Sequence, residues 1–349
     1  MDSRNQTVDA LRGLAALSVC FFHFTNGTHF RASSFLAPVG AYGWLGVDVF
    51  FVISGFIVPY AMWRAGYTLS AWPTFMVKRL VRLEPPYLVS IAIVMLLGIA
   101  STMAPGFLGP AIDWTPAQIA GHLGYLNTLL GLPWLNPVYW SLAIELQFYI
   151  LIGLAMPALV AMRPALRLVA IASMILLPMA LPQVSGATII PALPFFATGL
   201  LTFLLTAGLV RPAAYWVALA SVGAALIAAR GWAEALAAVA PAAAIIGLRI
   251  PRVGPVAWLG AISYSLYLLH VPVGGRVVSL ATRVSASPIF ELLVVAVAFA
   301  LAVAAAATLH ALVERPSRQL AARIGYGGCR QDHLRAAGLA AEGAPRNAE

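Results

Sequence analysis

Long apolar runs separated by short polar connections make up most of the chain. A membrane-spanning helix needs about 20 mostly apolar residues, and ten runs approach or reach that length. They cover residues 8–26, 42–62, 85–104, 138–161, 165–182, 189–207, 212–229, 232–249, 255–278 and 289–313. The pattern predicts an all-α, polytopic integral membrane protein with about ten transmembrane helices.

Composition supports this fold class. Of the 349 residues, 61% are hydrophobic and 9% are charged, and a soluble domain cannot bury so much apolar surface. The first residues lack the basic segment and cleavage site of a signal peptide, so we expect the first helix to be retained. Cys20 lies in an apolar run and Cys329 in a polar tail. We therefore expect no disulfide and no metal site.

The distribution of lysine and arginine predicts the orientation. With the N-terminus in the cytoplasm, 17 of the 21 Lys and Arg residues fall on the cytoplasmic side, as is usual for membrane proteins. The formal net charge of +9 then reflects cytoplasmic loops, and no nucleic-acid partner is expected. Both termini are predicted in the cytoplasm, and the protein is predicted to be a multi-pass component of the inner (plasma) membrane.

Two regions are predicted from this topology. Residues 1–316 form the transmembrane domain, and residues 317–349 form a cytoplasmic polar tail that is partly disordered. The largest outer loop, residues 105–137, contains no Lys or Arg and is expected to dip into the membrane interface.

The first apolar run contains two ionisable residues, Arg12 and His23. Eleven residues of α-helix turn through about 1100° and rise about 16 Å, so both side chains share one face. Arg12 is then at the cytoplasmic end and His23 in the outer half. Arg12 could simply extend to the lipid headgroups, and His23 could bind a neighbouring carbonyl. Ionisable residues inside a membrane are nevertheless functional by default.

Further polar residues lie in other apolar runs. They are Asp48 and Ser54 in the second run, Ser141, Glu145 and Tyr149 in the fourth, and His270 in the ninth. Among them, Asp48, Glu145 and His270 are predicted at a depth similar to that of His23, and Ser54 is predicted deeper than Asp48. The spacing of i, i+4 and i+8 places the three residues of the fourth run on one stripe. The two histidines and two acids are thus predicted to form a buried polar site.

A basic group precedes the third run. Lys78, Arg79 and Arg82 lie there, at the level of Arg12. Guanidinium groups match phosphate oxygens in pairs, so Arg12, Arg79 and Arg82 are predicted to bind a polyanion. Lys78 is more typical of ordinary membrane anchoring. A ligand that spans both sites needs a phosphorylated head and a long thin arm, which is the shape of acyl-coenzyme A.

The chain resembles the membrane-bound acyltransferase 3 family in six motifs that occur in order. These are DALRG with the Arg12–His23 pair, GVDVFFVISGF (46–56), KRLVRLEPPY (78–87), WSLAIELQFY (140–149), SYSLYLLH (263–270) and VERPSR (313–318). The resemblance implies a ten-helix domain that uses cytoplasmic acyl-CoA to acylate a hydroxyl. It also implies that Arg12 and His23 are essential, with His23 as the base, and that Arg79, Arg82 and Glu145 have roles.

Thioester-to-alcohol transfer needs a base because an alcohol is a weak nucleophile at neutral pH. We expect His23 to take the proton and Glu145 or Asp48 to orient its ring, with an acyl-His23 intermediate as the less favoured route. Trp140, Ser141 and Tyr149 are candidates for stabilising the oxyanion. We expect His270 to be a structural partner.

The resemblance leaves the substrates open. Acetyl-CoA is the default donor, with no metal cofactor, and the acceptor is a glycan, a lipid-linked sugar or a small hydroxylated molecule. The lipid bilayer is the remaining partner, and a homo-oligomer is compatible with the sequence. The competing class is a proton-coupled transporter of a small anionic or sugar-like solute, although the sequence contains no inverted repeat. A scaffold in an export complex would not explain His23.

Topology can be tested directly. A reporter fused at Glu349 is expected to read cytoplasmic, and one inserted into the 105–137 loop is expected to read external, because of the 17:4 distribution of basic residues. Alkaline phosphatase and fluorescent-protein fusions measure the two locations. An external C-terminus would reverse the placement of both polar groups.

Overall fold

The computed structural model describes residues 3–27, 35–103, 112–181, 186, 188–251, 253–281 and 287–325. Within these ranges the chain forms helices and no strand. In chain order they are α1 Ser3–Asn26, α2 Ala37–Gly40, η1 Gly43–Leu45, α3 Gly46–Arg64, η2 Leu69–Ala71, α4 Trp72–Thr102, α5 Pro116–Leu123, α6 Trp140–Ala161, α7 Pro164–Ala180, η3 Ile190–Ala192, α8 Leu193–Thr206, α9 Pro212–Arg230, α10 Trp232–Gly247, α11 Gly254–Leu269, η4 His270–Gly275, α12 Arg276–Ala281, α13 Pro288–Leu309, η5 His310–Glu314 and α14 Arg315–Arg323.

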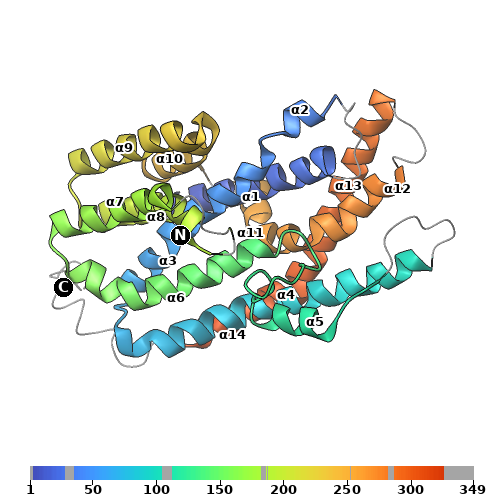
Figure 1. Ribbon diagram of the computed structural model, residues 1–349, viewed down its shortest axis with the longest axis horizontal. Coiled ribbons are helices and arrows are strands. Elements are labelled where there is room, and N and C mark those ends of the chain that lie inside the picture. The colour runs from blue at the N-terminus through green and yellow to red at the C-terminus, as the bar shows by residue number, and fades with distance from the viewer. Residues whose placement is uncertain are drawn as a thin grey trace, which may run out of the picture.

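Every predicted apolar run coincides with a helix. In the described part of the chain, seven helical segments are long and apolar enough to cross a membrane, and three shorter apolar helices, Pro164–Ala180, Ile190–Thr206 and Trp232–Gly247, account for the remaining runs. The prediction of an all-α polytopic membrane protein is confirmed. In Figure 1, α9 and α10 lie along one edge of the bundle, while α4 and α14 lie along the opposite edge.

The third apolar run belongs to a longer helix than the sequence predicted. Helix α4 begins at Trp72, well before residue 85, and includes Arg79 and Arg82. Hydropathy detects the apolar part of a helix but not a polar extension of it. The extension places these two arginines, at i and i+3, on one face. Helix α4 also continues through Pro85 and Pro86, which remove two backbone donors.

The predicted polar tail begins as a packed helix. Helix α14 lies against α4, and Ser317 and Ala321 are buried in this contact. The ammonium group of Lys78 donates to the carbonyl oxygen of Ile324 at 3.2 Å. Residues 326–349 lie outside the described residues, as does part of the predicted 105–137 loop.

The described part of that loop is held by a buried histidine. His122 donates from Nδ1 to the carbonyl of Gln118 at 2.7 Å, and its Nε2 accepts from the backbone N–H of Leu135 at 3.2 Å. Burial lowers the pKa of His122. This side chain therefore serves as a neutral structural link between the helix α5 and the segment that leads into α6.

Two glycines let α1 and α11 approach closely. A methyl group at Gly260 would collide with the backbone carbonyl of Asp9, and one at Gly13 would lie 3.3 Å from the backbone nitrogen of Gly260. The contacts advance in the same direction along both helices, from Asp9 with Gly260 to His23 with His270, so the two helices are parallel. Small residues at such crossings are typical of helix packing in membranes.

Two helices near this contact contain a π-helical segment. Segment η4 directly follows α11 and has His270 as its first residue. Segment η5 directly follows α13 and has Glu314 as its last residue. A π segment adds a residue to a turn and is often found at functional sites. Both segments place an ionisable side chain in the interior of the bundle, since His270 is 0% exposed and Glu314 is 2% exposed.

Gly260→Ala is expected to destabilise the protein by about 1–3 kcal/mol, because backbone atoms on α1 cannot move aside for the added methyl group. The matched control is Gly247→Ala on α10, where nothing lies within 4 Å of the added carbon. Alanine has the higher helix propensity, so this control should be neutral or slightly stabilising. Thermal unfolding in detergent measures both. Equal melting temperatures for the two variants would show that the α1–α11 contact is not tight.

Candidate functional site

A single cavity runs through the interior between α1, α3, α4, α6 and α11. Its polar lining consists of Arg12, Ser54, Arg79, Arg82, Ser141, Glu145, Tyr149, Ser263, Tyr264, Tyr267 and Glu314, and apolar residues, most of them on α3, complete its wall. The three arginines predicted to bind a polyanion and all three residues of the predicted stripe on the fourth run therefore line one space. We call the part near Arg12, Arg79 and Arg82 the arginine end of the cavity, and the part near Ser141 and Tyr267 its hydroxyl end.

At the arginine end, Arg79 is held between two aromatic rings. Its guanidinium carbon lies 5.2 Å from the ring centroids of both Phe75 and Tyr149. Such cation–π contacts contribute more where water is excluded. The hydroxyl of Tyr149 donates in turn to Oε1 of Glu145 at 2.5 Å. Arg79 is thus fixed in place by helices α4 and α6 together.

Glu145 is the centre of a small hydroxyl network. Its Oε1 also accepts from the hydroxyl of Ser54 on α3 at 2.8 Å. The sequence predicted that Glu145 and Tyr149 would share a face, and the structure confirms this contact. Ser54, which was predicted to lie deeper than Asp48, joins the same network. Neither contact reaches His23.

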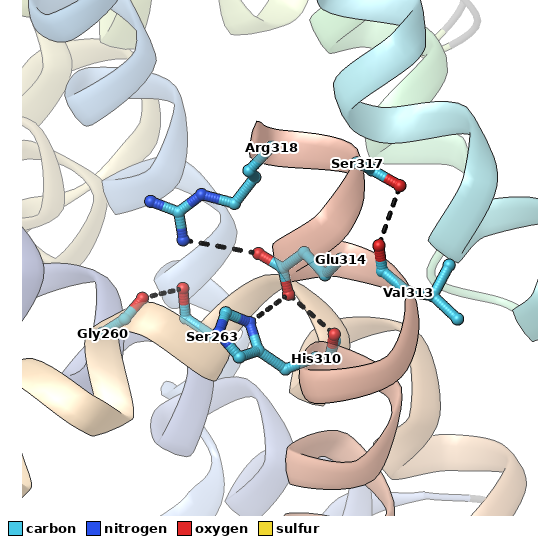
Figure 2. Close-up of polar contacts among 8 residues, drawn as sticks. Gly260, Ser263, His310, Val313, Glu314, Ser317 and Arg318 are labelled. Carbon is cyan, nitrogen blue, oxygen red and sulfur yellow. Dashed lines mark hydrogen bonds and ion pairs between the residues drawn. The ribbon is translucent and has the colours of Figure 1, made fainter. Parts of the chain in front are cut away.

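A buried carboxylate that was not among the predicted site residues, Glu314, lies beside the arginines. Glu314 accepts from the hydroxyl of Ser265 at 2.7 Å, lies 3.0 Å from Nδ1 of His310, and pairs with Arg318 at 3.8 Å. Figure 2 shows Glu314 between His310 and Arg318. The VERPSR motif contained this acid, but no sequence spacing connects residue 314 with Arg12.

Arg318 extends the predicted arginine group. Arg12 interacts electrostatically with Arg82, Arg318, Glu314 and Asp9. The side chain of Arg318 is 41% exposed, whereas that of Glu314 is 3% exposed. The repulsion between these arginines is offset by counter-charges, which Glu314 and Asp9 supply. Arg318 is thus the most accessible member of a group that Arg12 and Arg82 complete in the interior.

The hydroxyl end closes on a pair of hydroxyl groups. The hydroxyl oxygens of Ser141 and Tyr267 lie 2.6 Å apart, and both lie 3.1 Å from the carbonyl oxygen of Val138, so one hydroxyl donates to the other and the second donates to this carbonyl. The ring of Phe50 packs edge-on against Tyr267, with centroids 5.8 Å apart. Trp140, predicted as a further oxyanion candidate, is 40% exposed and packs on Phe51 instead of lining the cavity.

The two predicted histidines meet just beyond Tyr267. Nδ1 of His23 lies 3.2 Å from Nε2 of His270, and the ring centroids are 5.0 Å apart. The ring of His270 is 5.8 Å from that of Tyr267. His23 is half-buried and His270 is fully buried. We refer to them as the histidine pair.

The expectation that Glu145 or Asp48 orients the ring of His23 is wrong in this structure. Glu145 is engaged by Ser54 and Tyr149, while the contacts of His23 Nδ1 are His270 and the carbonyl of Val19 at 2.9 Å. Position along a helix gives the depth of a residue, but not which neighbour its side chain faces.

Asp48 lies on a different face of α3. Its neighbours Val47 and Phe50 line the cavity, whereas Asp48 does not. It is 8% exposed and interacts electrostatically with Arg230 and Glu234, at the junction of α9 and α10. Asp48 therefore does not belong to the histidine pair.

Comparison with known proteins identifies the family. The acyltransferase 3 family, described as an acyltransferase domain, matches residues 5–310. The chain belongs to this family. The match covers the histidine pair, every residue of the cavity lining except Glu314, and every predicted transmembrane run apart from the last three residues of the tenth.

Three curated relatives match parts of the chain. A putative membrane-bound transacylase BcsY of Komagataeibacter xylinus is 31% identical over 169 residues, which is 43% of this chain and 36% of the relative. The peptidoglycan O-acetyltransferase OatA of Listeria monocytogenes is 29% identical over 42% of this chain and 23% of its own length. Protein 2 in the picA locus of Rhizobium radiobacter is 33% identical over 25% of this chain and 41% of its own length. The chain thus matches less than half of each relative. No solved structure matches it.

Proposed function

We propose that the protein is a membrane O-acyltransferase that moves an acyl group, by default acetyl, from cytoplasmic acyl-CoA to a hydroxyl group. The acceptor is a cell-surface or secreted glycan, or a lipid-linked sugar. Membership of an acyltransferase family supports acyl transfer, and the name of the Listeria relative, a peptidoglycan O-acetyltransferase, supports a glycan hydroxyl as acceptor. The observation that carries the proposal is the single cavity that joins three arginines to the hydroxyls beside the histidine pair.

The arginine end suits the phosphorylated head of the donor. Arginine forks bind phosphate oxygens in pairs, and these charge-assisted bonds are about twice as strong as neutral ones. The lining contains three arginines and two glutamates, so its formal charge is 3 − 2 = +1, to which Arg318 adds another positive charge at the rim. Glu314 and Glu145 offset the arginines while the cavity holds no anion. A donor phosphate then adds the missing negative charge.

The reaction is a direct transfer in this proposal. Nε2 of His23 removes the proton from the acceptor hydroxyl as the oxygen attacks the thioester carbonyl. The carbon–sulfur bond then breaks, and the departing coenzyme A thiolate receives the proton from His23. Eleven residues separate Arg12 from His23, about 16 Å of helix. The donor arm extends along the cavity from Arg12 toward the histidine pair, with its thioester near the hydroxyls of Ser141 and Tyr267.

The donor site is tested with Arg82→Ala. This variant is expected to weaken acyl-CoA binding about tenfold or more, because a charge-assisted phosphate contact is worth about 1.5–3 kcal/mol. Arg82→Lys is expected to restore only part of the affinity, since the paired fork is lost. The matched control, Arg163→Ala, removes an exposed arginine that does not line the cavity and should bind normally. Isothermal titration with acetyl-CoA in detergent measures affinity. Normal binding by the Arg82 variant would show that Arg82 is only a membrane anchor.

The base is tested with His23→Gln. This variant is expected to lose transfer by a factor of about 10²–10⁴, because an amide cannot accept a proton at neutral pH, while donor binding is retained. Cys20→Ala, which removes a buried thiol one turn earlier on α1, should remain active and serves as the control. Transfer of label from acetyl-CoA to membrane glycans is measured at matched expression. A fully active His23→Gln variant would overturn the proposed base, and an absence of label transfer by the wild type would overturn the proposed function.

A further inference from the structure

Hydrogen-bond acceptors next to the histidine pair determine which ring nitrogen of each histidine carries a hydrogen. Nδ1 of His270 lies 2.8 Å from the carbonyl oxygen of Tyr267 and 3.1 Å from that of Leu266. A carbonyl oxygen can only accept, so Nδ1 of His270 carries a hydrogen. In a neutral imidazole the other nitrogen is then an acceptor. Nε2 of His270 therefore presents a lone pair to His23.

The same reasoning fixes the proton of His23. Its Nδ1 faces the carbonyl oxygen of Val19 at 2.9 Å and Nε2 of His270 at 3.2 Å. Both are acceptors, so Nδ1 of His23 is the donor in this pair of contacts. Its other nitrogen, Nε2, is left without a hydrogen. A general base needs an unprotonated nitrogen, and Nε2 of His23 is one.

The surroundings keep His270 neutral. In the described part of the chain, its ring contacts His23, Phe24, Tyr267 and backbone carbonyls. No carboxylate is among these contacts, and the side chain is 0% exposed. A second positive charge 3.2 Å from a protonated His23 would lack a counter-charge. The pair can therefore take up one proton. His23 is the half-buried member, so it is the histidine that contacts the hydroxyl of the acceptor substrate.

Resting on the function proposed above, we infer that His270 is a positioning residue that holds His23 in the tautomer with an unprotonated Nε2. When His23 takes the acceptor's proton, the Nδ1–H···Nε2 hydrogen bond to His270 becomes charge-assisted and stabilises the imidazolium. A neutral imidazole thus occupies the place that a carboxylate holds in a Ser-His-Asp triad.

The backbone at His270 is built for this arrangement. His270 begins the π-helical segment η4, where the regular turn of α11 ends. The close packing of Gly274 against Phe24 of α1, where a methyl group would collide with the ring, holds this segment beside α1. His270 accordingly has little freedom to move away from His23.

Two substitutions separate positioning from packing. His270→Gln can keep both a donor to the helix carbonyls and an acceptor toward His23, whereas His270→Phe fills the space but offers no acceptor. We expect His270→Phe to lower kcat for acetyl transfer about 10–100-fold with the KM for acetyl-CoA unchanged, since small misplacement of a catalytic group has effects of this size. His270→Gln should restore most of the loss.

The proton positions are tested without any activity measurement. Solid-state NMR of the wild-type protein in lipid, labelled with ¹⁵N-histidine, distinguishes protonated from unprotonated ring nitrogens. We expect a through-hydrogen-bond correlation between His23 Nδ1–H and His270 Nε2, assigned by its loss in His23→Gln and His270→Phe.

The outcomes are distinct. A proton on Nε2 of either histidine would overturn the inference, as would full activity of His270→Phe. Equal loss of activity and of acetyl-CoA binding in both His270 variants would overturn it as well, because that pattern indicates only a packing role. If the wild type transfers no acyl group, the proposed function fails, while the NMR correlation still decides whether His270 orients His23.

Discussion

The close contact between α1 and α11 is the constraint on which the rest of the site depends. These helices are parallel and touch backbone to backbone at Gly13 and Gly260. His23 and His270 each follow ten residues later, so both rise about 15 Å from the crossing and arrive at the same level. The register of one helix pair thus creates the histidine pair. The same register places Arg12 beside the crossing, within electrostatic range of Arg82 and Arg318.

The ionisable groups that line the cavity have protein partners that take the place of water. An unpaired charge in an apolar interior costs far more than a hydrogen bond returns. Glu314 is therefore surrounded by Ser265, His310 and Arg318, and Glu145 by Ser54 and Tyr149. Arg79 gains part of its stabilisation from two aromatic rings. These partners keep an arginine-rich cavity stable before any anion enters.

The two ends of the cavity have different chemistry because an unpaired charge is costly in an apolar interior. The arginine end is charged and includes an accessible rim at Arg318, which suits a phosphorylated ligand that must come and go. The hydroxyl end is formed by uncharged groups, and its hydroxyls bind each other and the carbonyl of Val138. A neutral histidine pair behind them fits this environment, since an ionised carboxylate at that depth would need its own counter-charge. The buried chemistry of the site therefore changes from ionic to neutral along one path.

The sequence by itself determined the fold class, because the apolar runs needed to cross a membrane are a local property of the chain. It also determined that Arg12 and His23 share a face and that Glu145 meets Tyr149, since both relations lie within one helix and follow from its period. Only the tertiary structure decided which side chains meet across helices. It joined His23 to His270 in place of Glu145 or Asp48. It also placed Asp48 within electrostatic range of Arg230 and Glu234, and brought Glu314 and Arg318 within electrostatic range of Arg12. These pairings depend on the rotation and register of each helix against its neighbours, which are fixed by glycine contacts and π segments that hydropathy does not reveal.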